Sequence, residues 1–231
     1  MKKKIIIVAA VLVVVGGGYW GVTTYKEIQK GKAERANTKG AQLVEPGTTT
    51  TQTPSNSQTV PAGPVRTFKL GPKSLIKWTG YKKVGQHSGW FDLFEGTGKM
   101  PGTDITQASI DFSIETDSCD TDNGILTGIM KDNRFFNCQK CPISTFKSVS
   151  IVKANGPDKY TVTGDLNLRD ITKRISFDAV ITVKDDVVKL DADFKVNRRW
   201  WNIVYESVGD ALLYDDVRLE LNAEAKEVKG R

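Results

Sequence analysis

Histidine occurs once in the 231 residues, and cysteine occurs three times. Apart from the adjacent Ser88, the lone His87 has no Ser, Cys or paired carboxylate close to it in the sequence, so no nucleophilic triad can be recognised. A zinc site built on Cys138 and Cys141 would need two more ligands, and the chain offers only Cys119 and His87. We therefore expect no bound metal, no cofactor and no enzymatic activity.

A basic surface is also missing from most of the chain. Residues 1–66 contain nine Lys and Arg against three Asp and Glu, whereas residues 67–231 contain 24 of each sign. The net charge of +6 therefore belongs entirely to the N-terminal part. The remainder is neutral and lacks the positive face that nucleic-acid binding requires, so nucleic acid is excluded as a partner.

The first 22 residues are typical of a membrane anchor or a signal peptide. Three lysines precede a run without charge from Ile5 to Val22, about eighteen residues, close to the minimum length for a membrane span. The aromatic pair Tyr19 and Trp20 favours a retained anchor, whereas the small residues before it have the spacing of a signal-peptidase site, which would release a secreted protein. We expect the rest of the chain in the periplasm or another extracytoplasmic space, anchored in the cytoplasmic membrane.

Residues 23–66 are predicted to be a flexible linker. Within them, the stretch PGTTTTQTPSNSQTVPAGP has no charge, six threonines and four prolines. Such a composition cannot form a core and prefers an extended, polyproline-like chain. The folded part, residues 67–231, would then stay near the membrane without being fixed to it.

From residue 67 onward apolar and polar residues alternate, as in half-buried strands. In ASIDFSIE, for example, Phe112 and Ile114 share one face and the acidic residues the other. The pattern predicts eight antiparallel strands, at residues 74–81, 89–96, 108–115, 144–152, 160–168, 175–183, 188–196 and 217–223. Residues 123–136 suit one short helix instead, capped by Asp122 or Asn123. Eight such strands can form either a sandwich or a closed barrel.

Five pieces of the sequence stand in a recognisable order: IKWTGYKKVGQHSGWF, TDSCDTDNGILTGIMKDNRFF, CPISTFKSVSI, YTVTGDLNLRDITKRISF, and VNRRWWNIVY with DVRLEL. Together they resemble the YceI-like family of lipocalin-like lipid-binding proteins, over about residues 67–225. The resemblance implies an all-β fold, an eight-stranded antiparallel lipocalin-like barrel. It also implies an apolar interior that holds a polyisoprenoid or similar long-chain amphiphile, and no general catalytic activity.

With this resemblance, the chain is expected to carry, store or sense an isoprenoid or another long-chain lipid. The candidate ligand contacts are Trp78, His87, Phe112, Ile114, Phe146, Leu166, Phe177, Ile181, Phe194 and Arg198. His87 would be a hydrogen-bonded residue at the barrel mouth or a head-group contact, and Arg198 would close the barrel end or bind a ligand oxygen. A filled barrel that serves as a structural module, or an enzyme acting on such lipids, would be the alternatives.

The chain departs from the family pattern at its cysteines and at two turns. Cys138 and Cys141 stand where apolar or aromatic residues are usual, and they follow a helix rather than opening one, unlike a thioredoxin-type site. In an oxidising compartment we expect a disulfide between them, or between one of them and Cys119. Asp170 and Asn202 stand at usual glycine positions, and both residue types tolerate a left-handed backbone.

Overall fold

The computed structural model describes residues 25–45, 63–83, 85–205 and 213–229. The expected membrane segment, residues 1–22, lies outside them, and no helix within them is long and apolar enough to span a bilayer. The described residues form twelve strands in one sheet and two α-helices. Three 3-10 helices, η1 (Ile105–Gln107), η2 (Thr116–Ser118) and η3 (Arg198–Trp201), complete the secondary structure of this part of the chain.

The α-helices are α1 (Tyr25–Asn37) and α2 (Gly124–Lys131). The strands are β1 (Gln42–Leu43), β2 (Val65–Leu70), β3 (Leu75–Lys82), β4 (Gly85–Phe91), β5 (Phe94–Pro101), β6 (Ser109–Glu115), β7 (Cys119–Thr121), β8 (Ile143–Lys153), β9 (Lys159–Leu168), β10 (Ile171–Lys184), β11 (Val187–Asn197) and β12 (Leu213–Glu227).

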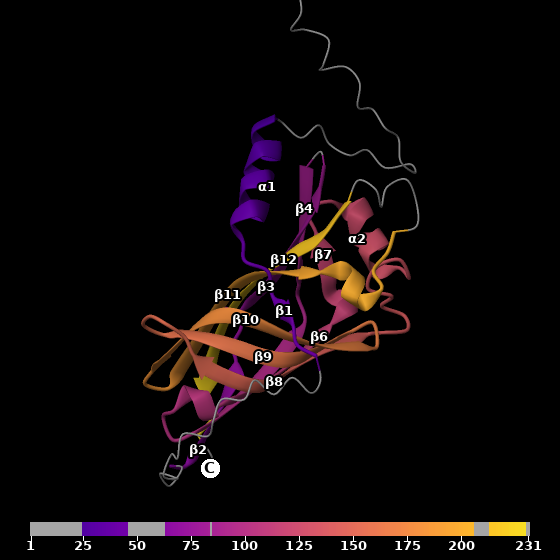
Figure 1. The fold of residues 1–231 in the computed structure, drawn as a ribbon. Helices are drawn as coiled ribbons and strands as arrows, with labels where there is room; N and C mark the ends of the chain where they lie inside the picture. Colours follow the sequence, from indigo (N-terminus) through magenta and orange to yellow (C-terminus); the bar gives the residue numbers. More distant parts are fainter. Residues whose placement is uncertain (1–24, 46–62, 84, 206–212, 230–231) are drawn as a thin grey trace, which may run out of the picture.

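Eight of these strands close into a ring. From β10 the pairing runs through β9, β8, β6, β5, β2 and β12 to β11, which pairs again with β10, and every pair is antiparallel. The predicted eight-stranded antiparallel barrel is therefore confirmed, and the sandwich is excluded. Strands β3, β4 and β7 extend the wall at one end of the barrel (Figure 1).

The long strand β12 joins the ring to this extension. Its last residues, Ala225–Glu227, pair with β2, whereas the part from Leu213 to Asn222 pairs with β3 on the same edge. Its other edge pairs with β11 along that strand's whole length. The barrel is therefore longer on this side than an eight-stranded ring alone would be.

The composition of the ring differs from the sequence expectation in two regions. The stretch around Gly89 to Gly96 is expected to be a single strand, but it divides into β4 and β5 at a turn formed by Asp92 and Leu93. Strand β5 contains Gly96 and Gly98, which interrupt the apolar alternation that would have identified it. For this reason the pattern does not resolve β5. Strand β2 is not predicted either, and the first predicted strand, residues 74–81, corresponds to β3, which lies outside the ring.

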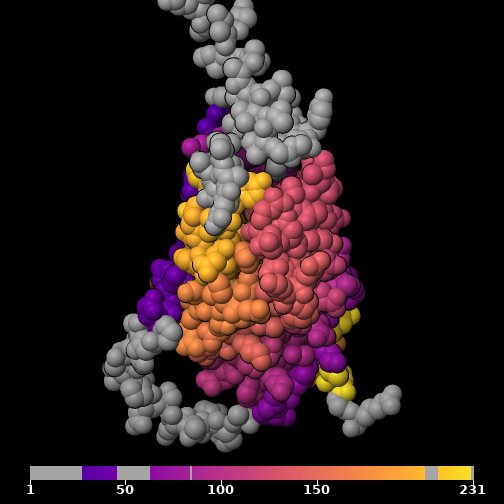
Figure 2. Space-filling view, turned by 90° about the vertical axis from the view of Figure 1, so that its right-hand side faces the viewer, coloured from indigo at the N-terminus to yellow at the C-terminus, as the bar shows by residue number. Residues whose placement is uncertain are grey.

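The predicted N-cap of helix α2 and two predicted turns are confirmed, although the helix ends at Lys131 instead of near residue 136. Oδ1 of Asn123 accepts hydrogen bonds from the backbone N–H groups of Ile125, at 3.0 Å, and Leu126, at 3.2 Å, as a helix N-cap does. Asp170 and Asn202 have φ values of 58° and 52°, the left-handed backbone expected of residues in glycine positions. Figure 2 shows the face on which α2 and the chain after it, in pink, lie beside the orange residues of the barrel wall.

Helix α1 is a departure from the predicted linker. It lies outside the barrel beside β4 and β12 (Figure 1). The guanidinium of Arg35 bonds the Asp216 carboxylate at 2.9 Å and lies 3.9 Å from the ring centroid of Tyr214, while Lys195 Nζ donates to the Arg35 carbonyl at 2.8 Å. This helix has no apolar stripe in its sequence, so polar contacts with the barrel stabilise it. Residues 46–62 of the predicted linker lie outside the described residues.

Candidate functional site

The interior of the barrel is a continuous apolar region made of two buried clusters. One cluster, on strands β8 to β11, contains Phe177, Ile181 and Phe194. The other, on β3, β4, β7 and α2, contains Trp78 and Phe136. Five partly buried residues pack against both clusters: Phe135, Leu168, Val217, Leu219 and Leu221. The two clusters therefore share one wall.

Aromatic residues of strands β8, β10 and β11 meet inside the barrel. The rings of Phe177 and Phe194 are stacked, with centroids 4.2 Å apart and an interplanar angle of 10°. Phe146 lies 5.8 Å from Phe177 in a tilted arrangement. The sequence expectation that these three residues share the inner face is met, and Leu166 and Ile181 lie in the same cluster.

Several inward-facing side chains are only half-buried. Leu219 lies between the charged residues Arg218 and Glu220 on β12, and it is directly opposite Phe194 on one side and Trp78 on the other. Its side chain therefore faces inward, yet part of its surface remains accessible. Side chains with the same partial burial are Phe112, Ile114, Phe146, Leu166, Val217 and Leu221. These inward-facing side chains are therefore not completely covered by neighbouring protein atoms, as the side chains of a fully packed core would be.

Three glycines let aromatic rings lie flat against the wall. A Cβ atom at Gly164 would lie 2.3 Å from the Phe146 ring, and one at Gly89 would lie 2.4 Å from the Trp78 ring. At Gly96 the corresponding distance to the Phe112 ring is 3.1 Å. Sequence reasoning did not identify these glycines as part of the site. The sequence feature that could have identified them is a glycine at an inward-facing strand position, because such a glycine marks a close approach by another group.

Arg198 is placed at one end of the barrel, in η3, and is only 5 % exposed. Its three guanidinium nitrogens all have protein acceptors: Nη1 donates to the Ile203 carbonyl at 2.6 Å, Nε to the Tyr214 carbonyl at 3.3 Å, and Nη2 to Asp215 Oδ1 at 3.0 Å. This geometry fits the role of closing the barrel end. The arginine ties η3 to the start of β12.

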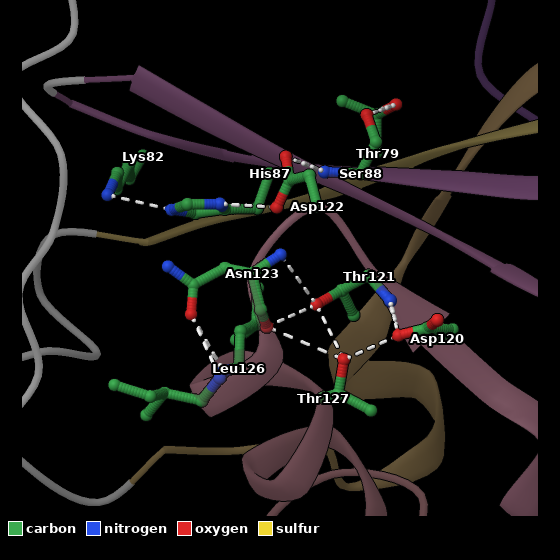
Figure 3. A network of polar contacts seen from close by, with 11 residues as sticks. Thr79, Lys82, His87, Ser88, Asp120, Thr121, Asp122, Asn123, Leu126 and Thr127 are labelled. Atoms are coloured by element: carbon green, nitrogen blue, oxygen red, sulfur yellow. Dashed lines mark hydrogen bonds and ion pairs between the residues drawn. The ribbon is translucent and has the colours of Figure 1, made fainter.

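His87 belongs to a polar network at the end of the β3–β4 hairpin (Figure 3). Its Nδ1 lies 2.8 Å from Asp122 Oδ1, and its Nε2 lies 3.2 Å from Lys82 Nζ. Because an ionised carboxylate can only accept, Nδ1 carries the proton and Nε2 accepts from the lysine. Asp122 Oδ2 also accepts from the backbone N–H of Ser88 at 2.9 Å. The network holds a cation and an imidazole at the edge of the apolar interior.

Burial lowers the pKa of His87 below its ordinary value, although the hydrogen bond to Asp122 acts in the opposite direction. Burial also lowers the pKa of Lys82, again against the attraction of Asp122. A neutral imidazole is therefore the stable form in the folded protein near neutral pH.

We expect the protein to lose stability between pH 7 and pH 5 partly through His87. Its pKa is lower in the folded chain than the value of about 6.5 in an unfolded one, so below that pH the unfolded chain binds more protons and acid favours unfolding. Thermal unfolding of the native chain and of His87→Gln at pH 7, 6 and 5 measures this contribution. The native chain should show the steeper fall in Tm. Identical falls in the two proteins would show that His87 does not contribute to the loss of stability in acid.

The three cysteines are buried and free in the structure. The expected disulfide between Cys138 and Cys141 is not formed, and neither is bonded to Cys119. Burial raises the pKa of Cys119 to about 12, and it also raises that of Cys138. The Cys141 thiol donates to Asp170 Oδ2 at 3.3 Å. Thiols of this kind are poor nucleophiles near neutral pH.

No cluster of three or more His, Cys, Asp or Glu side chains that could hold a metal ion is found among the described residues. The Asp120–Asn123 segment, which has the composition of a calcium-loop start, is instead used internally. Asp120 Oδ1 accepts from Thr127 Oγ1 at 2.9 Å, and Thr121 Oγ1 donates to the carbonyl of Asn123 at 2.7 Å (Figure 3). These bonds hold the start of α2 against β7.

Comparison with known proteins agrees with this architecture. A UPF0312 protein of Pectobacterium atrosepticum is 32% identical over 111 residues, which are 48% of this chain and 55% of that protein. The YceI protein of Salmonella arizonae is 29% identical over 98 residues, 42% of this chain and 50% of that protein. The matched regions thus span about half the length of these curated relatives.

Solved structures show the same fold at lower identity. The crystal structure of Burkholderia cenocepacia BcnA has a TM-score of 0.62 at 21% identity, and the match covers 67% of this chain and 97% of that one. A polyisoprenoid binding domain from Saccharophagus degradans, implicated in plant cell wall breakdown, has a TM-score of 0.56 at 13% identity, with 70% and 98% covered. The model of the YceI-like domain matches residues 68–225, most of the chain and nearly all of the barrel. This chain belongs to the YceI-like family.

Proposed function

We propose that this protein is an exported, membrane-tethered binding protein that holds a polyisoprenoid or similar long-chain lipid inside its barrel. The observation that carries the proposal is the inner wall of half-buried apolar side chains, such as Leu219 and Phe112. Apolar walls beside internal space favour an apolar ligand over water. The polyisoprenoid-binding domain of Saccharophagus degradans, which shares the fold, supports this class of ligand.

The free energy of burying a lipid tail is large enough for the lipid to stay bound during purification. Burying about 300 Å² of an isoprene-rich tail at about 25 cal/mol per Å² contributes roughly 7 kcal/mol before ordering costs. The polar network of Lys82, His87 and Asp122 lies where a head group could be bound at the edge of the interior. Binding rather than catalysis is proposed, since the inner face is lined mainly by apolar side chains and burial raises the pKa of Cys119 and Cys138, which makes these thiols poor nucleophiles.

The tether is proposed from residues 1–22, whose apolar run follows three lysines. Such a segment can hold the barrel at the outer side of the cytoplasmic membrane. A barrel kept near a bilayer would take up lipid from it and act as a carrier, store or sensor. Membrane fractionation followed by alkaline carbonate extraction tests the anchor, and a mature N-terminus near Tyr19 would show a cleaved signal instead.

The test of the proposed function is the lipid content of the purified protein. The full-length chain, purified from a bacterial host, is extracted with organic solvent and the extract is analysed by mass spectrometry. We expect about one long-chain isoprenoid or comparable lipid per protein molecule, well above the content of an unrelated membrane-anchored protein purified in parallel. A barrel that is empty and also takes up no added isoprenoid would favour the structural module.

A further inference from the structure

The barrel wall has a seam between β10 and β11. Residues Ala179–Lys184 of β10 pair with Val187–Ala192 of β11. Before Ala179 and after Ala192 the two strands separate. If the pairing continued, Asp178 would lie directly opposite Asp193. Two carboxylates in that position repel each other, which gives a physical reason for the strands to part there.

Residues 39–44, here called the plug, fill this seam. The Ala41 N–H donates to the Lys195 carbonyl on β11 at 2.7 Å, and the Lys195 N–H donates to the Lys39 carbonyl at 2.9 Å. On the other side, Val44 N–H donates to the Arg174 carbonyl on β10 at 2.9 Å. The plug thus hydrogen-bonds to both separated strands, and Figure 1 shows β1 lying against β10.

The seam leads from an outer cavity to the aromatic interior. A cavity of about 830 Å³ lies between α1, the plug and the outer face of the barrel, and Phe177 and Phe194 are among its lining residues. Their stacked rings are the first inward-facing side chains where β10 and β11 part. Two groups therefore close the wall here, the aromatic pair on the inside and the plug on the outside.

We propose that this seam is a lateral portal through which the lipid tail enters and leaves the barrel, and that residues 39–44 open and close it. The proposal rests on the proposed lipid-binding function. The plug lies outside residues 68–225, which match the family model, so it is a feature of the N-terminal part of this chain. A side opening suits a long tail, because it avoids threading the whole molecule through the barrel end.

The contacts of the plug are suited to reversible opening. The ion pair between Lys39 and Asp178 is 2.5 Å long, but both side chains are more than half exposed. Exposed ion pairs contribute little to stability. Leu43 is also exposed, so only the small Ala41 side chain packs against the apolar cluster. A few backbone hydrogen bonds at a surface open far more readily than the long ladders of the ring.

The decisive experiment locks the plug with a disulfide. Gln42 lies directly opposite Ser176, and Cα atoms of such antiparallel pairs are within the distance that a disulfide spans. The full-length Gln42→Cys, Ser176→Cys variant, purified in detergent, is loaded with all-trans-retinol, a fluorescent isoprenoid alcohol. Release into phosphatidylcholine vesicles is then followed by fluorescence. We expect release to be at least ten-fold slower in the oxidised form than in the reduced form.

The controls separate the portal from the binding function. The native chain under the same oxidant and reductant should release retinol at one rate, because its three cysteines are buried. Equal rates for the two forms of the variant, with the disulfide verified by thiol titration, would overturn the portal and leave the barrel end as the route. No retinol uptake by the native chain is a different result: it would contradict lipid binding itself and the portal with it.

Two single substitutions test the same gate in opposite directions. Ala41→Pro removes the N–H that donates to Lys195, and we expect release at least ten-fold faster than in the native chain. A Cβ atom at Gly40 meets nothing within 4 Å, so Gly40→Ala should stiffen the plug and slow release about two- to five-fold. Unchanged rates in both variants, with native circular dichroism, would count against the proposal; should Ala41→Pro not fold, Gly40→Ala and the disulfide variant decide.

Discussion

Replacing Phe177 with aspartate should abolish lipid retention. The Phe177 ring is 6 % exposed, stacked on Phe194 and close to Phe146, so the new carboxylate would lie among apolar side chains. An ionised carboxylate without a partner in such surroundings costs several kcal/mol, and a hydrocarbon tail cannot solvate it. Extraction of the full-length variant should yield at least ten-fold less lipid per protein molecule than the native chain.

A matched control is available on the same strand. Val180 faces outward and is 39 % exposed, so Val180→Asp adds the same charge to β10 without placing it in the interior. We expect its lipid content to equal that of the native chain. If Phe177→Asp folds, as judged by circular dichroism, and still retains the native amount of lipid, the ligand does not lie beside this ring. Phe177→Leu, which keeps the site apolar, provides a milder change should the aspartate variant not fold.

The second large effect is expected at Arg198. Replacing it with methionine keeps the length of the side chain but removes the donors to two carbonyl groups and to Asp215. Breaking a buried charge network on one side typically costs 3–5 kcal/mol. Because Asp215 is 39 % exposed and can be hydrated, we expect the lower end, about 3 kcal/mol less free energy of unfolding.

Arg199 is the natural control for this change. It binds the same Asp215 oxygen, at 2.6 Å, but its side chain is 42 % exposed. Arg199→Met should therefore lower the free energy of unfolding by less than about 1 kcal/mol. Urea denaturation of both variants measures the difference. If both variants lost a similar free energy of unfolding, the burial of Arg198 would not make it more important for stability than the exposed Arg199.

The sequence predicts much of the barrel because half of each strand faces an apolar interior. Strands β6 and β9 to β12 follow the alternation of apolar and polar residues closely, and Phe177, Ile181 and Phe194 are found on the inner face as predicted. Strand β5 could not be recognised in this way. Its inward positions include Gly96, whose missing side chain makes room for Phe112 and leaves no apolar signal.

Two parts of the candidate site depend on contacts between distant residues and therefore escape sequence reasoning. His87 and Asp122 are 35 positions apart, and only the pairing of β4 with β7 brings them within hydrogen-bonding distance. Helix α1 and the plug look like linker because their residues are mostly polar. Their partners, including Asp216, Lys195 and Arg174, lie 130 or more positions further along the chain. Such contacts leave no periodic pattern.

The double pairing of β12 has a consequence for how the protein folds. Ala225 in β12 lies opposite Leu70 in β2, so the ring closes between segments 155 positions apart. Pairings of such long sequence separation form slowly, because the chain must first lose the entropy of a long loop. Until β12 is in place, β2 and β11 each have an unpaired edge and the ring stays open. Folding should therefore be completed only after the last strand has been synthesised.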